Sequence, residues 1–178
     1  MRRKLLGLLG IAALCGGCAS RTAYDRHWNA EPVVTASAVE ATPLAGKWQG
    51  SWQSNDSDYY FGLAHAIIMP LEAVKLTGGT PGQTYEAHFQ LYHFWVFTEE
   101  FRVTFTAAAP RDGKVSFYGE RIMNPIDGVC RYDGFLQGDK IVTSFNSIKD
   151  YGTIVLRRVT AESPDVTGAA WGPSQDNH

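Results

Sequence analysis

Short runs of alternating apolar and polar residues are the feature that most constrains how this chain can fold. In the clearest run, Phe101, Val103 and Phe105 face one way while Arg102 and Thr104 face the other. A period of two with one polar face predicts strands of a sheet that is wetted on one side. Beyond the N-terminal segment no stretch keeps a 3.6-residue apolar period, so long helices are not expected.

Eight segments of this kind follow one another, and residues typical of tight turns separate them. Examples are the Asp112-Gly113 and Gly138-Asp139 pairs, which favour short hairpin connections. Segment 64–73 is the least clear, because its apolar residues also fit a helical turn. We expect strands at residues 46–54, 60–69, 83–95, 99–107, 114–123, 129–136, 140–146 and 151–159.

Eight successive strands with short connections must bury one face and avoid exposed edges. Closing the sheet into an up-and-down barrel does both. A barrel of eight strands has an interior that is filled by side chains or holds one small ligand. The sequence therefore predicts an all-β fold, a small antiparallel up-and-down barrel over residues 44–159. A sandwich of two sheets is the alternative.

The N-terminal residues have the layout of an export signal. A basic stretch, residues 1–4, precedes ten uncharged apolar residues, 5–14, and a run of small residues, 15–20. Ten apolar residues are too few to cross a bilayer, which takes about 20. The order basic, apolar, small predicts a signal peptide over residues 1–17 rather than a structural helix.

Cys18 makes this segment resemble a bacterial lipoprotein signal, in which a cysteine behind small residues is acylated and begins the mature chain. Two glycines precede Cys18, although Cys15 stands where such signals usually have leucine. Acylation of Cys18 would anchor the protein to a membrane of the cell envelope. Ala19 favours the outer membrane, facing the periplasm. Cleavage after Ser20, releasing a secreted protein, is the alternative.

The rest of the chain divides into three parts. Residues 18–43 carry the acylated cysteine and are expected to form a flexible tether. They are rich in Ala, Val and Thr and show no sustained period. The barrel follows, and residues 160–178 form a disordered tail.

The chain has 16 basic and 18 acidic residues, a net charge of −2. A mildly acidic chain lacks the basic surface of nucleic-acid binding proteins, so no nucleic-acid partner is expected.

Sequence motifs that carry catalytic chemistry are not found. There is no G-x-S-x-G, phosphate-binding glycine loop, C-x-x-C or H-E-x-x-H. With Cys18 acylated, Cys130 is the cysteine left in the barrel, so no internal disulfide is expected and Cys130 is interpreted as a small buried hydrophobe. No cofactor is expected.

His65 and His88 are weak candidates for a metal site. If the connection between residues 69 and 83 is symmetric, the two histidines pair across one ladder and could bind Zn²⁺. A zinc site also needs a third ligand and a second shell, and His93 is the further histidine considered. The alternative, that both are surface or rim histidines, is favoured, and no metal is expected.

Two ends of the barrel segment resemble the lipocalin-like (calycin) barrels. Gly46-Lys47-Trp48 opens the first strand and Arg157-Arg158 closes the last. In that superfamily the Trp plugs one end of the barrel and a basic residue of the last strand lies across its ring. The resemblance assigns these roles to Trp48 and Arg158. A guanidinium over an indole gains roughly 0.5–2 kcal/mol.

The chain is more closely similar to a group of uncharacterised bacterial proteins. They share a G-x-W-x-G-x-W start and a Y/F-x-S-x-x-D-x-G-x-x-x-L-x-R finish, here residues 46–52 and 145–158. The resemblance spans about residues 44–158. It implies the barrel fold and carries no function with it.

Aromatic residues dominate the face that is expected to point inward. They fill a packed core or line a site for a small apolar or amphipathic ligand. Gly50, Gly62 and Gly119 interrupt the strands and either thin the wall or permit sharp bending. The candidate ligand-binding residues are Trp52, Phe89, Phe101, Phe105, Phe117 and Phe145.

Three functions follow as hypotheses. The first is a non-enzymatic, membrane-anchored envelope lipoprotein that binds a small apolar ligand inside its barrel. The second is a packed barrel that serves as a structural or interaction module of the envelope, with an unidentified protein partner. The third is a histidine-based hydrolase. An open aromatic-lined cavity favours the first, a filled interior the second, and converging His and Asp side chains the third.

Overall fold

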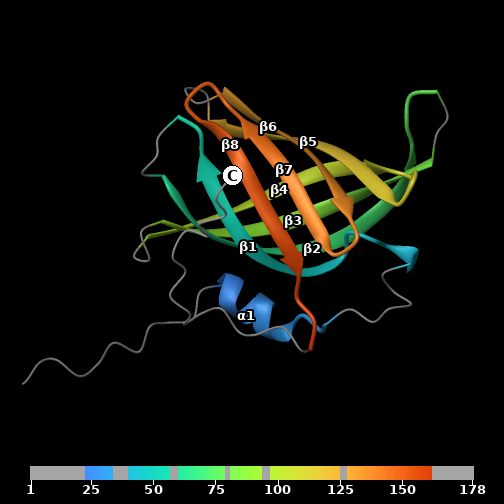
Figure 1. Ribbon diagram of the computed structural model, residues 1–178, viewed down its shortest axis with the longest axis horizontal. Coiled ribbons are helices and arrows are strands. Elements are labelled where there is room, and N and C mark those ends of the chain that lie inside the picture. The colour runs from blue at the N-terminus through green and yellow to red at the C-terminus, as the bar shows by residue number, and fades with distance from the viewer. Residues whose placement is uncertain are drawn as a thin grey trace, which may run out of the picture.

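The chain folds into a closed antiparallel barrel of eight strands, with one short helix outside it (Figure 1). The computed structural model describes residues 23–33, 40–56, 60–78, 81–93, 97–124 and 128–161. Each strand pairs with its neighbours in sequence and β1 pairs with β8, which confirms the predicted all-β up-and-down barrel. The elements are α1 (Ala23–Ala30), β1 (Gly46–Ser54), β2 (Phe61–Lys75), β3 (Pro81–His93), β4 (Phe97–Ala108), β5 (Lys114–Asn124), β6 (Gly128–Gln137), β7 (Lys140–Asn146) and β8 (Tyr151–Arg158).

The strands match the expected ones closely, and the largest difference lies in β2. β1 and β7 have the predicted bounds, whereas β2 continues to Lys75 instead of ending at residue 69. The register shifts between Pro70 and Ala73, which lets a proline sit in the strand without interrupting the ladder on either side. The doubtful segment 64–73 is therefore strand, not helix.

The helix α1 lies in the segment that was expected to be a flexible tether. Tyr24 and Trp28 are four residues apart and share one helix face, and Tyr24 is 1% exposed. Packing of this face on the outside of the barrel wall stabilises a helix that would not persist alone. The segment expected to be a flexible tether thus contains a helix at residues 23–30. Cys18 and the predicted tail beyond residue 161 lie outside the described residues.

One end of the barrel is closed by Trp48. The β1–β8 register places Trp48 opposite Arg158, whose guanidinium carbon lies 4.2 Å from the centre of the indole ring. Trp48 is fully buried, and its Nε1 donates to the carbonyl of Leu44 at 2.9 Å. Arg158 donates to the carbonyls of Ala45, at 2.7 Å, and Pro43. The structure therefore brings together the two residues that the resemblance assigned to a plug.

The half of the barrel next to this plug is packed. Tyr85 stacks on Phe105 with ring centres 5.5 Å apart, and Phe105 meets Phe117 at 5.0 Å. The void that Phe89, Phe105 and Phe117 border has a volume of about 20 Å³. That space holds little more than one water molecule.

Among the described residues, no helix is long and apolar enough to cross a membrane.

Two inward-facing glycines mark places where the strands approach one another closely. A Cβ at Gly50 would lie 2.0 Å from the carbonyl oxygen of Val155, and one at Gly62 would lie 1.7 Å from that of Tyr92. Any side chain at either position would therefore clash with backbone. These glycines permit the strong bending of a small barrel.

Candidate functional site

The end of the barrel opposite Trp48 opens into a cavity of about 220 Å³. It lies where β1, β3, β5 and β7 end and where β2, β4, β6 and β8 begin. Its wall is mainly aromatic and aliphatic, with polar side chains toward the rim. The cavity is lined by Trp52, Tyr60, Leu91, His93, Glu99, Phe101, Arg121, Met123, Cys130, Tyr132, Phe145, Ser147, Asp150 and Ile154.

The six aromatic residues predicted to contact a ligand divide between two places. Trp52, Phe101 and Phe145 line the open cavity. The other three border the small void in the packed half. Alternation placed all six on the inner face correctly, but it carries no information on depth along the barrel. Depth depends on the register and on which end the plug closes.

Trp52 forms a fixed part of the cavity wall. Its indole Nε1 donates to the carbonyl of Tyr92 at 3.2 Å, and its ring meets the edge of the His93 ring at 4.6 Å. Trp52 is 4% exposed. Its apolar surface is therefore presented to the cavity in one orientation.

Arg121 lies on the inner, apolar face of β5. Its guanidinium carbon is 4.4 Å from the centre of the Phe101 ring. Its Nη1 is 3.6 Å from a carboxylate oxygen of Glu99. Arg121 was not among the residues predicted from the sequence, although the alternation Val115, Phe117, Gly119, Arg121 places an arginine on the apolar face of an expected strand.

The Arg121 side chain also bridges the shortest ladder of the barrel. β4 and β5 pair only over Thr104–Ala107 and 117–120, so Arg121 is the first β5 residue beyond the ladder. Its contacts with Glu99 and Phe101 cross from β5 to β4 toward the open end. The seam between these strands is thus held by side chains where backbone pairing stops.

Tyr132 and Cys130 lie side by side on the inner face of β6. Burial and the neighbouring Cys130 raise the pKa of the Tyr132 hydroxyl well above its ordinary value, while the positive charge of Arg121 acts in the opposite direction. Burial likewise raises the pKa of the Cys130 thiol. Both groups are therefore protonated at neutral pH. A protonated buried thiol is a poor nucleophile, in line with the interpretation of Cys130 as a buried hydrophobe.

The rim carries carboxylates that are already engaged. The Ser54 hydroxyl donates to Oδ1 of Asp150 at 2.5 Å. The hydroxyl of Ser147 donates to the Asp150 carbonyl at 3.0 Å, which fixes the turn between β7 and β8. Glu99 lies between Arg121 and His93. The Nε2 atom of His93 is 3.7 Å from the Glu99 carboxylate. The open end is therefore polar at its edge and apolar within.

His65 and His88 lie outside the barrel, under α1, and both are 4% exposed. Trp28 stacks on His65 with ring centres 4.8 Å apart, and Tyr24 meets His88 edge-on at 4.9 Å. They are therefore neither surface nor rim histidines, because a helix that the sequence analysis did not foresee covers them. Their expected pairing is also wrong: His65 lies opposite Gln90, because β2 and β3 extend into the connection and pair two residues away from the expected register.

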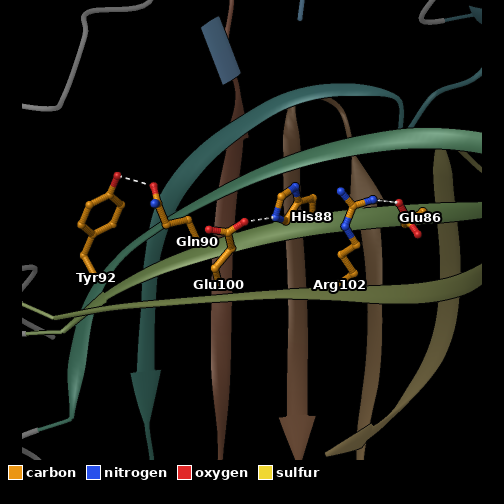
Figure 2. Close-up of polar contacts among 6 residues, drawn as sticks. All are labelled: Glu86, His88, Gln90, Tyr92, Glu100 and Arg102. Carbon is orange, nitrogen blue, oxygen red and sulfur yellow. Dashed lines mark hydrogen bonds and ion pairs between the residues drawn. The ribbon is translucent and has the colours of Figure 1, made fainter. Parts of the chain in front are cut away.

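A row of polar pairs runs along β3 and β4 on this outer wall, as Figure 2 shows. His88 Nε2 lies 2.8 Å from Oε1 of Glu100. Burial lowers the pKa of His88, and the hydrogen bond with Glu100 opposes this effect. Within the described ranges, no group of three or more His, Cys, Asp or Glu side chains is placed to hold a metal ion. The other two pairs of the row are Arg102–Glu86 and Tyr92–Gln90.

Comparison with known proteins gives no match for this chain, whether against protein-family models, curated proteins or solved structures. The site therefore has to be interpreted from its own geometry.

Proposed function

We propose that this protein binds a small apolar or amphipathic molecule in the cavity at the open end of its barrel, without transforming it. One observation carries the proposal: a cavity of about 220 Å³ with an aromatic wall, at the end of the barrel opposite the fully buried Trp48. Concave, mostly apolar sites with a few polar groups are typical of small-molecule binding. The plug and the eight strands are compatible with the lipocalin-like resemblance.

The size of the cavity restricts the ligand. Sites for drug-sized molecules usually have about 300–1,000 Å³, whereas this cavity has about 220 Å³. It therefore suits a small molecule, or one end of a longer molecule whose remainder extends past the rim.

The arrangement of reactive groups argues against the hydrolase hypothesis. His65 and His88 face outward beneath α1, so they cannot act on a molecule held inside the barrel. The thiol that lines the cavity has a raised pKa and stays protonated. His93, Glu99 and Asp150 do line the cavity, but His93 Nε2 lies 3.7 Å from Glu99 and Asp150 accepts a hydrogen bond from Ser54. These side chains are already paired at the rim, which favours holding a molecule over transforming it.

A packed interaction module remains the second candidate. Apolar side chains are exposed around the open end, with Ile122 80% and Ile148 82% exposed. Contiguous exposed apolar patches are typical of contact surfaces. This candidate takes first place if a folded protein shows no saturable binding of an apolar molecule.

Titration with an environment-sensitive apolar dye tests the ligand-binding proposal. Met123 lines the cavity, and Met123→Trp should fill it at a cost of about 1–3 kcal/mol in stability. The matched control is Ile122→Trp, on the opposite face of the same strand. We expect saturable binding that Met123→Trp weakens about tenfold or more, and that Ile122→Trp leaves unchanged. Equal binding by all three folded proteins would contradict an internal site.

We also propose that the protein is a lipoprotein of the cell envelope, anchored through Cys18 and facing the periplasm. The support is the sequence alone: a basic start, a short apolar stretch and small residues before the cysteine. In its native host, Cys18→Ser should move the protein from the membrane to the soluble fraction and remove the lipid label, whereas Cys15→Ser should leave both unchanged. A Cys18→Ser variant that stays membrane-bound and labelled would contradict the anchor.

A further inference from the structure

Resting on this proposed binding function, we propose that the ligand is a small amphipathic monocarboxylic acid, and that Arg121 selects it. The carboxylate would pair with the Arg121 guanidinium just inside the rim. The apolar part would lie against the inner wall formed by Trp52 and Phe145.

The position of Arg121 carries the first step of this argument. Its side chain is 24% exposed, and it lies over the Phe101 ring, in a cavity whose wall is otherwise mostly apolar. Of the described residues that line the cavity, it is the only lysine or arginine. A partly buried guanidinium gains most from a carboxylate that can accept two parallel hydrogen bonds. Apolar surroundings strengthen such a pair.

Glu99 lies where the ligand carboxylate would pair with Arg121. Its carboxylate is 3.6 Å from Arg121, longer than the roughly 2.7–2.9 Å of a charge-assisted hydrogen bond. The Glu99 side chain is 44% exposed and is shared with His93. It can therefore turn to solvent at little cost when a better-placed carboxylate arrives.

The remaining charges explain why one acidic group is favoured and two are not. Asp150 also lines the cavity, and its carboxylate accepts a hydrogen bond from Ser54. Together with Glu99 it surrounds the rim with negative charge. A second carboxylate at the far end of the ligand would lie against the apolar inner wall, where burial of an unpaired charge is costly, whereas an amine in place of the first carboxylate would be repelled by Arg121. A neutral alcohol would not displace Glu99, so the Arg121 guanidinium would keep its contact of 3.6 Å with that carboxylate.

Competition against the bound dye tests this choice with molecules that share a chain of eight carbons and differ in their end groups: octanoate, octanol, octylamine and the dicarboxylate suberate. We expect octanoate to compete about tenfold or more better than octanol, the gain typical of a hydrogen bond to a charged group. Suberate and octylamine should compete worse than octanoate. Arg121→Met should abolish the difference between octanoate and octanol while dye binding persists.

Two further variants make the test specific. Glu99→Gln removes the competing carboxylate and should tighten octanoate binding without changing octanol. Arg131→Met, the same substitution on a side chain that is 65% exposed and paired with Glu120 outside the cavity, should change neither. If Arg121→Met does not fold, Arg121→Lys should keep a reduced preference for octanoate.

The outcomes separate the inference from the function on which it rests. Saturable dye binding with equal competition by octanoate and octanol would overturn the role of Arg121 and leave the cavity as the binding site. Unchanged octanoate affinity in Glu99→Gln would overturn the displacement of Glu99. Absence of saturable binding by any of these molecules, the dye included, would overturn both proposals.

Discussion

Two arginines that point into the barrel have different surroundings at its two ends. Arg158 lies over Trp48 and donates to the carbonyls of Ala45 and Pro43, so its donors serve the closed end. Arg121 lies over Phe101 and faces an open cavity, with an ion pair of 3.6 Å. In both places a guanidinium stacks on an aromatic ring. At the Trp48 end this stacking stabilises the barrel, whereas at the open end it leaves the positive charge of Arg121 facing the cavity.

The plug predicts a measurable coupling between its two side chains. Trp48→Ala removes a fully buried indole and should cost about 3–5 kcal/mol in the free energy of unfolding. Arg158→Ala should be less costly alone. Because the two groups stack at 4.2 Å, the double variant should lose less than the sum of the single losses. Urea denaturation of the three variants measures this, and strict additivity would contradict the pairing.

The sequence indicated the contact between Trp48 and Arg158 but not the position of Arg121, for physical reasons. The plug lies at fixed ends of the first and last strands, so a motif and a terminal arginine suffice to indicate it. Arg121 stands on an apolar face in an alternation that was visible. It was missed because alternation tells which face a residue is on, whereas its role depends on where the β4–β5 ladder ends.

Among the elements, α1 is the one that the sequence did not predict. It has eight residues and only two large apolar side chains, which are too few for a periodic pattern. It forms because Tyr24 and Trp28 pack on the barrel wall. The strands were predictable because alternation acts within each strand. The end of β2 was not, because a register shift near Pro70 extends it beyond its apolar part.

The contact between α1 and the wall should weaken on acidification. Burial lowers the pKa of His88 below its ordinary value of 6.5; Glu100 acts against this, while Arg102 and His27 add to it. A histidine with a lowered pKa stays neutral in the docked state but takes up a proton when exposed. Its contribution is therefore complete above about pH 6.5 and is lost as the pH falls toward the lowered pKa.

Comparison of the unfolding free energy at several pH values between the protein and its His88→Gln variant measures this contribution. We expect the difference in stability between the two to shrink as the pH falls below about 6.5. Protection of the α1 amides from hydrogen exchange should decrease over the same range in the unmodified protein only. A difference between the two proteins that stays constant with pH would contradict the role of His88.

At the scale of the whole molecule, the barrel has a packed half and an open half. Trp48 and the stacked aromatic rings fill the first, and the cavity of about 220 Å³ occupies the second. The barrel itself followed from eight strands with short connections. The division into halves did not, because it depends on how deep each side chain lies. That division is the physical basis of the binding proposal.

Mapping of backbone amide chemical shifts during a titration with octanoate tests this account most directly. Binding at the open end predicts saturable shifts at inward-facing residues of that end, such as Trp52, Arg121 and Tyr132, and unshifted amides around Trp48 and Arg158. Saturable shifts confined to the outer wall beneath α1, or a folded protein without saturable shifts, would contradict it.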